Sequence, residues 1–304
     1  MTDALLAFAG LIPVTLAQSL ILSFVVLAIM IPFRMLGFPD LTSEGAFPLG
    51  GCVCALGMLA GLPPLVAIAL AMVAGFAAGC ITAFIHLRFR IHTLLAGILM
   101  MTMLYSVNLR LLGRSNQQVF NIPTVFDYVP ATAGGAVMSK IIVAGLFALA
   151  LFLLLRSYFL TERGTAMRAV GANPDMAEAQ GINVWLYTIA GLGLAGSFAA
   201  LSGAVMVQSQ GFADVNMGLG ILINGLAALM IGEALIGKKT VVRQLLAPFI
   251  GVIVYYQLIS LCLVAGLPPG DLKLATGLFV LFMLAVPTLR GKQHGIAPRE
   301  ALKD

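Results

Sequence analysis

Four polar residues lie close together early in this sequence, and their types could do chemistry. The stretch DLTSEG holds Asp40, Thr42, Ser43 and Glu44. Carboxylates and hydroxyls at such spacing can cap a helix start, and inside a membrane they often mark the pathway of a polar solute. We therefore place Asp40, Thr42, Ser43 and Glu44 at a translocation pathway. A cap needs one acid, so we assign capping to Asp40 or Thr42 and expect Glu44 to face the pathway.

A second polar stretch, ERGTAMRAVGANPDMAEAQGIN, spans residues 162–183 of an otherwise apolar chain. Asn173 is a good N-cap, Pro174 suits the first helical position, and Asp175 suits the positive end of a helix. The pattern predicts a short helix over residues 174–180. Seven residues are too few for a stable isolated helix, so it must dock on this protein, on lipid headgroups or on a partner.

The flanks of this short helix also carry signals. We expect residues 159–170 to continue the preceding span and Gly171 to stop it in a left-handed conformation. Gly181 is expected to end the short helix, with Ile182 folding back as an apolar contact.

The composition shows what surrounds these stretches. The chain has 304 residues, of which 61% are hydrophobic and 10% are charged, against roughly 25% charged residues in soluble domains. This predicts an all-α integral membrane protein, because the runs are apolar nearly all round. About nine spans are expected, at 11–33, 46–60, 64–86, 93–112, 138–158, 185–207, 218–236, 246–265 and 274–289.

The cations predict the orientation of these spans, because cytoplasmic loops are enriched in Lys and Arg. With alternating spans and the C-terminus inside, the inner loops hold Arg34, Arg88, Arg90, Arg156, Arg163, Arg168, Lys238, Lys239, Arg243, Arg290, Lys292, Arg299 and Lys303. The outer segments hold Arg110, Arg114, Lys140 and Lys273. Thirteen against four favours an outside N-terminus and places residues 159–184 in the cytoplasm.

The second predicted span is too short. Residues 46–60 would rise about 22 Å as a helix, less than the ~30 Å hydrocarbon core. Its start should therefore lie in a protein-lined position, as a broken helix. Residues 40–59 and 214–235 share an acid or amide, then glycines, then a helix, which suggests a weak internal repeat. We assign Asn216 and Asn224 to the same pathway.

Several other patterns have simpler explanations. GLGLAG (191–196) lies inside an apolar run, so helix packing explains it better than nucleotide binding. GEALIGKKT (232–240) lacks the Ser or Thr of a phosphate-binding loop. No nucleophile with a base and no metal set is evident, and nucleic acid binding is not expected. The whole chain, 1–304, is interpreted as one transmembrane domain without an enzyme active site or a cofactor.

The polar stretch resembles a known family. RAVGANPDMAEAQGI (168–182) is similar to the cytoplasmic coupling loop of ABC-importer permeases of the branched-chain amino acid and ribose class. FPDLTSEGAFPLGG (38–51) and DVNMGLGILINGLAALMIGEAL (214–235) resemble the subgroup of tryptophan/tyrosine or uncharacterised transport permeases. The resemblance implies ATPase coupling by Gly164, Arg168, Gly171, Asn173, Pro174, Asp175, Ala177, Gly181 and Ile182. The loop would seat in a groove of the ATPase, and Ala177→Trp is expected to block that groove.

The resemblance also implies partners and a location. Two ATPase subunits would bind ATP and Mg²⁺, a second permease copy would complete the channel as a homodimer or heterodimer, and a soluble binding protein would deliver a small solute. The solute would be an amino acid, with an aromatic one as a candidate, and the location a bacterial inner membrane. Two alternatives stay open: a stand-alone ion-coupled carrier, and a structural membrane protein for which the loop is only a docking site.

Overall fold

The computed structural model describes residues 2–129, 135–266 and 268–271, together with positions 274, 277, 278 and 281. The described chain is almost entirely helical. Its longer helices are α1 (Thr2–Met30), α2 (Thr42–Leu59), α3 (Pro64–Phe89), α4 (Thr93–Leu112), α5 (Gly135–Phe159), α6 (Glu162–Ala172), α8 (Val184–Gln210), α9 (Ile221–Ile236) and α10 (Val241–Val264). The short elements are η1 (Ile31–Leu36), β1 (Asn116–Gln118), η2 (Val125–Tyr128), α7 (Pro174–Ala179), β2 (Phe212–Asp214) and η3 (Pro269–Asp271).

Every predicted apolar run up to residue 265 corresponds to one of these helices, although the run 11–33 continues into η1 and the run 218–236 begins three residues before α9. By length and hydropathy, six of the described segments can cross a membrane: Gly10–Leu36, Pro64–Phe89, Thr93–Leu112, Gly135–Phe159, Val184–Gln210 and Val241–Val264. α9 is apolar but shorter. The run at 274–289 lies almost wholly outside the described residues, so the count of nine spans and the orientation stay predictions.

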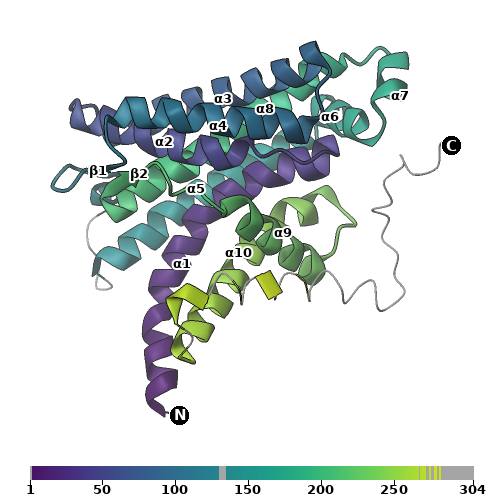
Figure 1. Cartoon of the computed structure of the whole chain (residues 1–304). Coiled ribbons are helices and arrows are strands. Elements are labelled where there is room, and N and C mark those ends of the chain that lie inside the picture. The colour runs from purple at the N-terminus through teal and green to yellow at the C-terminus, as the bar shows by residue number, and fades with distance from the viewer. Residues whose placement is uncertain are drawn as a thin grey trace.

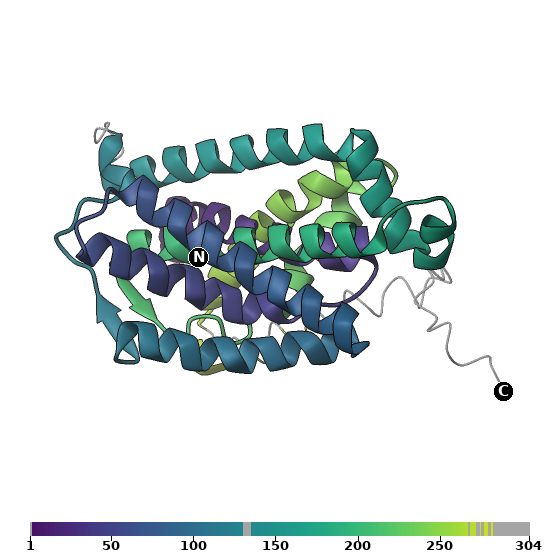
Figure 2. The ribbon, with the colours of Figure 1, turned by 90° about the horizontal axis from the view of Figure 1, so that it is seen from above.

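The helices are arranged around α8, which packs against α1, α2 and α3. Figure 1 shows α6 and α7 at one end of the molecule and the β1–β2 pair at the other, and Figure 2 agrees. α9 packs against α10, and both contact α1. The polar stretch and the β ribbon therefore lie at opposite ends of the long helices.

Small residues allow α8 to approach its neighbours closely. A Cβ on Gly203 would collide with the carbonyl oxygen of Phe47 in α2, and one on Gly196 would collide with that of Gly75 in α3. Gly193 packs in the same way against the Phe76 ring. Helix packing is therefore confirmed for GLGLAG, because its glycines lie at helix crossings in an apolar interior.

The end opposite α7 is closed by a short ribbon and one buried amide. β1 pairs antiparallel with β2, with Gln117 opposite Ala213. The Gln208 side chain at the end of α8 accepts from the Val125 N–H at 2.8 Å and donates to the Pro64 carbonyl at 3.3 Å. Gln208 is buried, so these bonds replace water and join η2 and α3 to α8.

We expect Gly203→Ala to destabilise the protein, because the added methyl group would push α8 away from the Phe47 backbone. Overpacking of this kind costs about 1–3 kcal/mol. Gly145→Ala in α5 is the matched control, since its Cβ would meet nothing within 4 Å. The measurement is the melting temperature in detergent, and equal melting of the two variants would contradict the close-packing account.

Candidate functional site

The short helix α7 begins and ends as its sequence predicts. The Asn173 Oδ1 atom accepts from the Met176 N–H at 3.1 Å, and Pro174 occupies the first helical position. Gly181 has a φ of 81°, and the Ile182 N–H donates to the Ala177 carbonyl at 3.0 Å. The helix spans Pro174–Ala179, one residue shorter than predicted. Both ends are closed by local hydrogen bonds, so α7 has a defined shape despite its length.

Two expectations about the preceding segment are wrong. α5 ends at Phe159 instead of continuing, and α6 starts at Glu162 behind an N-cap by Thr161. Gly171 lies inside α6 and stops nothing. Its lack of a side chain serves packing, because a Cβ there would collide with the carbonyl oxygen of Met35 in η1.

α6 carries two more of the residues predicted for coupling. The Arg168 Nε atom lies 3.4 Å from the Gly164 carbonyl one turn earlier, and its Nη2 donates to the Thr165 hydroxyl at 3.2 Å. Gly164 is buried, and a Cβ there would collide with the backbone of Phe159. Gly164 thus permits the tight turn from α5 into α6.

The structure places Ala177 on the inner side of α7, toward its own protein. Its side chain is only 3% exposed, and α7 packs against α6 and α8, so Ala177 belongs to the contact between α7 and its own protein. Met176 is 59% exposed, and Asp175 and Glu178 are exposed beside it. These three residues form the outer face of α7, which is the face that a partner could reach.

The first polar cluster forms the start of α2, which begins at Thr42 and so four residues before the predicted apolar run. The Asp40 Oδ1 atom accepts from the Thr42 N–H at 3.0 Å and from its hydroxyl at 2.6 Å. The Thr42 hydroxyl also contacts that of Thr82 in α3 at 2.9 Å. Burial raises the pKa of the Asp40 carboxyl, and the bonds from Thr42 oppose that rise. Leu41 occupies the N-cap position, and Asp40 caps α2 from one residue earlier by accepting from its first N–H group.

Glu44 makes a contact that the sequence does not predict. Its Oε1 atom accepts from the Gly220 N–H at 2.6 Å, directly before α9. The backbones also meet, since a Cβ on Gly218 would collide with the Glu44 carbonyl oxygen. The second acid thus caps a different helix. The two segments proposed as a repeat lie against each other, although the repeat itself stays a prediction.

The structure separates the remaining pathway candidates. Ser43 is buried, and its hydroxyl has no hydrogen-bond partner in the described part of the chain. Asn216 is exposed in the turn after β2, where its N–H donates to the Asp214 carboxylate. Asn224 in α9 accepts from the Tyr255 hydroxyl at 3.0 Å and lines a small cavity between α1, α9 and α10. Glu44 and Asn224 therefore lie near the start of α9, whereas Asn216 precedes it.

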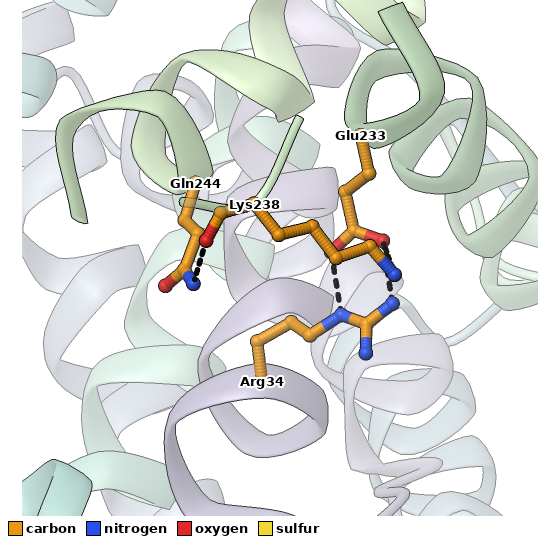
Figure 3. A network of polar contacts seen from close by, with 4 residues as sticks. All are labelled: Arg34, Glu233, Lys238 and Gln244. Carbon is orange, nitrogen blue, oxygen red and sulfur yellow. Dashed lines mark hydrogen bonds and ion pairs between the residues drawn. The ribbon is translucent and has the colours of Figure 1, made fainter. Parts of the chain in front are cut away.

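The sequence does not predict one network of charged side chains, which surrounds Glu233. The buried Glu233 carboxylate near the end of α9 is held by the Arg34 guanidinium from η1 and by the Lys238 ammonium at 3.0 Å (Figure 3). The Gln244 side chain donates to the Lys238 carbonyl. A single acid in an apolar helix signals that it needs a partner, but the sequence does not tell which cation meets it.

Comparisons with known proteins give the site its context. Residues 12–287 match the family described as branched-chain amino acid transport system / permease component. The chain belongs to this family. It is 36% identical to a tyrosine transport system permease protein of Clostridioides difficile, over 92% of both chains. It is 33% identical to an uncharacterised protein of Rickettsia prowazekii, over 89% of this chain and 95% of the relative.

A more distant relative is the ribose import permease protein of Escherichia coli K12, 27% identical over 72% of each chain. No solved structure matches the chain significantly. The resemblance that the motifs predict is confirmed: the protein is a multi-pass membrane protein and the permease component of an ABC-type transport system. It is a transport subunit and not an enzyme.

We expect Glu44→Ala to lower the melting temperature more than Glu44→Gln does. Alanine leaves the Gly220 N–H without its acceptor, whereas glutamine keeps an oxygen there. Loss of a hydrogen bond to a charged group costs about 1.5–3 kcal/mol. Glu178→Ala, which removes an exposed carboxylate, is the control, and a Glu44→Ala protein that melts like this control would refute the cap on α9.

Proposed function

We propose that this permease is the membrane subunit of an ATP-driven importer, and that α7 is the helix through which a partner ATPase moves it. The observation that carries the proposal is the form of α7. It is capped at both ends, held to its own protein by the buried Ala177 and exposed on the face of Met176. A helix of this kind can transmit a displacement, because its caps and its packing against α6 and α8 define its shape and position.

The outer face of α7 defines the chemistry of its partner. Met176 offers a flexible apolar side chain of the kind that fills irregular pockets. Asp175 and Glu178 add negative charge to the same exposed face. The complementary surface is a groove with an apolar pocket and at least one cation at its rim.

The solute pathway is proposed to pass the starts of α2 and α9. There Asp40 caps α2, Glu44 joins α2 to α9, and Asn224 lies on the first turn of α9. The N-terminal ends of α2 and α9 both lie in this region, and the positive end of a helix dipole suits an anionic group such as the carboxylate of an amino acid. Tyrosine is the first solute to test, because a relative that aligns over 92% of both chains is named a tyrosine transport system permease protein.

The other subunits of the transporter are proposed from the family. Two ATPase subunits bind ATP and Mg²⁺ and dock at the α7 end, which we propose is cytoplasmic. A second permease copy, identical or related, completes the channel. A soluble binding protein delivers the solute at the end that carries β1 and β2, and the assembly lies in a bacterial inner membrane.

Replacing Met176 with Glu is expected to weaken association with the ATPase at least tenfold, because it places a charge in an apolar pocket. Met176→Leu keeps the volume and polarity and is the matched control. Association is measured by co-purification from membranes and by titration of the purified components. Equal association of the two variants would refute the coupling assignment of α7.

The orientation is tested with single cysteines in a variant that lacks Cys52, Cys54, Cys80 and Cys262. Ala172→Cys, next to α7, should react with a membrane-impermeant thiol reagent only after the cells are opened. Phe120→Cys, which replaces a ring that is 57% exposed at the β1 end, should react in intact cells. The reverse pattern would overturn the proposed topology.

An ion-coupled carrier would behave differently in the same system. Proteoliposomes that contain this chain alone should show no uptake of tyrosine under an ion or proton gradient. Uptake should appear when the ATPase, the binding protein and ATP are added. Gradient-driven uptake without the ATPase would replace the importer with the carrier.

A further inference from the structure

Glu233 is the acidic residue of α9, and its side chain is 2% exposed. Two nitrogens of the Arg34 guanidinium, Nε and Nη2, each meet one carboxylate oxygen at 2.5 Å. Lys238 contacts the same carboxylate at its edge. Figure 3 shows the guanidinium and the ammonium converging on Glu233 from different segments. This two-point contact, called the fork below, links Arg34 in η1 to Glu233 in α9, which lies 199 residues further along the chain.

Stability alone explains this arrangement poorly. A buried ion pair seldom stabilises a fold more than well-packed apolar residues would. A two-point contact between guanidinium and carboxylate instead sets both the distance and the orientation of the groups that it joins. The pair therefore determines where the end of α9 lies relative to η1.

η1 also contacts α6, the helix that directly precedes α7. The Gly171 backbone in α6 lies directly on the Met35 carbonyl, and a Cβ on Gly37 would collide with the Gly171 carbonyl oxygen. No side chain separates the two backbones at this point, so little can be compressed between them. A movement of α6 is thus passed to η1 and to Arg34.

α9 is equally closely attached to α10. A Cβ on Gly232 would collide with the Ala247 carbonyl oxygen, and one on Gly251 with that of Ala228. These contacts make the α9–α10 pair one unit. A displacement at Glu233 consequently reaches the start of α9, where Glu44 holds the Gly220 N–H.

We propose that the Arg34–Glu233 ion pair is the positioning link between α7 and the α9–α10 pair. It carries the displacement of α7 and α6, through η1, to the start of α9 beside the proposed pathway. The inference rests on the proposed function, since it assumes that an ATPase displaces α7. Arg34 and Glu233 touch no solute and act through the helices that they join.

The link is tested in proteoliposomes that contain the permease with its ATPase and binding protein. The readout is the number of ATP molecules hydrolysed per molecule of tyrosine taken up. Arg34→Gln and Glu233→Gln should each raise this ratio about tenfold, within the usual range of coupling between distant sites. The double variant should be no worse than either single one, because the two residues act as one unit.

Two further variants separate positioning from charge balance. Arg34→Lys keeps the positive charge but loses the fork, so it should fold and still raise the ratio. Lys239→Gln removes an exposed cation next to Lys238 and should leave the ratio unchanged. A purely structural role would lower the amount of folded complex, and hydrolysis and uptake would then fall together at a constant ratio.

A second readout needs no solute. Ile223 lies on α9 and is 61% exposed, so Ile223→Cys in the cysteine-free background reports on this helix. ATP with vanadate should change its labelling rate in the complex, and Arg34→Lys should abolish that change while ATPase binding stays normal.

The outcomes distinguish this inference from the proposed function. A wild-type complex without ATP-dependent uptake or labelling change would overturn both. A responsive wild-type complex, with Arg34→Lys and Glu233→Gln behaving like it in ratio and labelling, would overturn the ion-pair link alone.

Discussion

A backbone N–H group that is buried at a helix start in an apolar protein needs an acceptor within the protein, because no water is available to replace it. The breaks in these helices show how this chain meets that requirement. The start of α2 is closed by Asp40, the start of α9 by Glu44, and the backbone of η2 by Gln208. Glu44 and Gln208 also join two segments, whereas Asp40 bonds locally to Thr42. The same bonds that satisfy the backbone therefore define the architecture around the proposed pathway.

The second recurring device is direct contact between backbones. Gly203, Gly196, Gly232 and Gly171 each lie where a methyl group would meet a carbonyl oxygen of another segment. Apolar burial gives little preference between helices in lipid, so close packing of small residues carries much of their association. These contacts are also stiff. They make neighbouring segments move together, as a transporter driven from one end requires.

Sequence signals predict the structure where they act on neighbouring residues. Asn173, Pro174 and Gly181 specify α7 because their side chains or φ angles act on the residues next to them. Asp40 as a cap of α2 follows from the same kind of reasoning. The expected helix stop at Gly171 is wrong because a glycine that ends a helix and a glycine that permits a close contact look alike in sequence. The sequence also leaves open which side of α7 is buried, because only its neighbours α6 and α8 decide that Ala177 faces the protein.

The sequence by itself determined the membrane class, the helical content, the capped α7 and the permease family, since composition and short motifs carry that information. Only the tertiary structure decided that Glu44 caps α9, that Arg34 meets Glu233, and that α6 lies on η1. These contacts join residues far apart in the chain, and many cations and free N–H groups could have met each acid. The packing of the helices selects among them, because only the chosen partners come within hydrogen-bonding distance once the glycine crossings have closed.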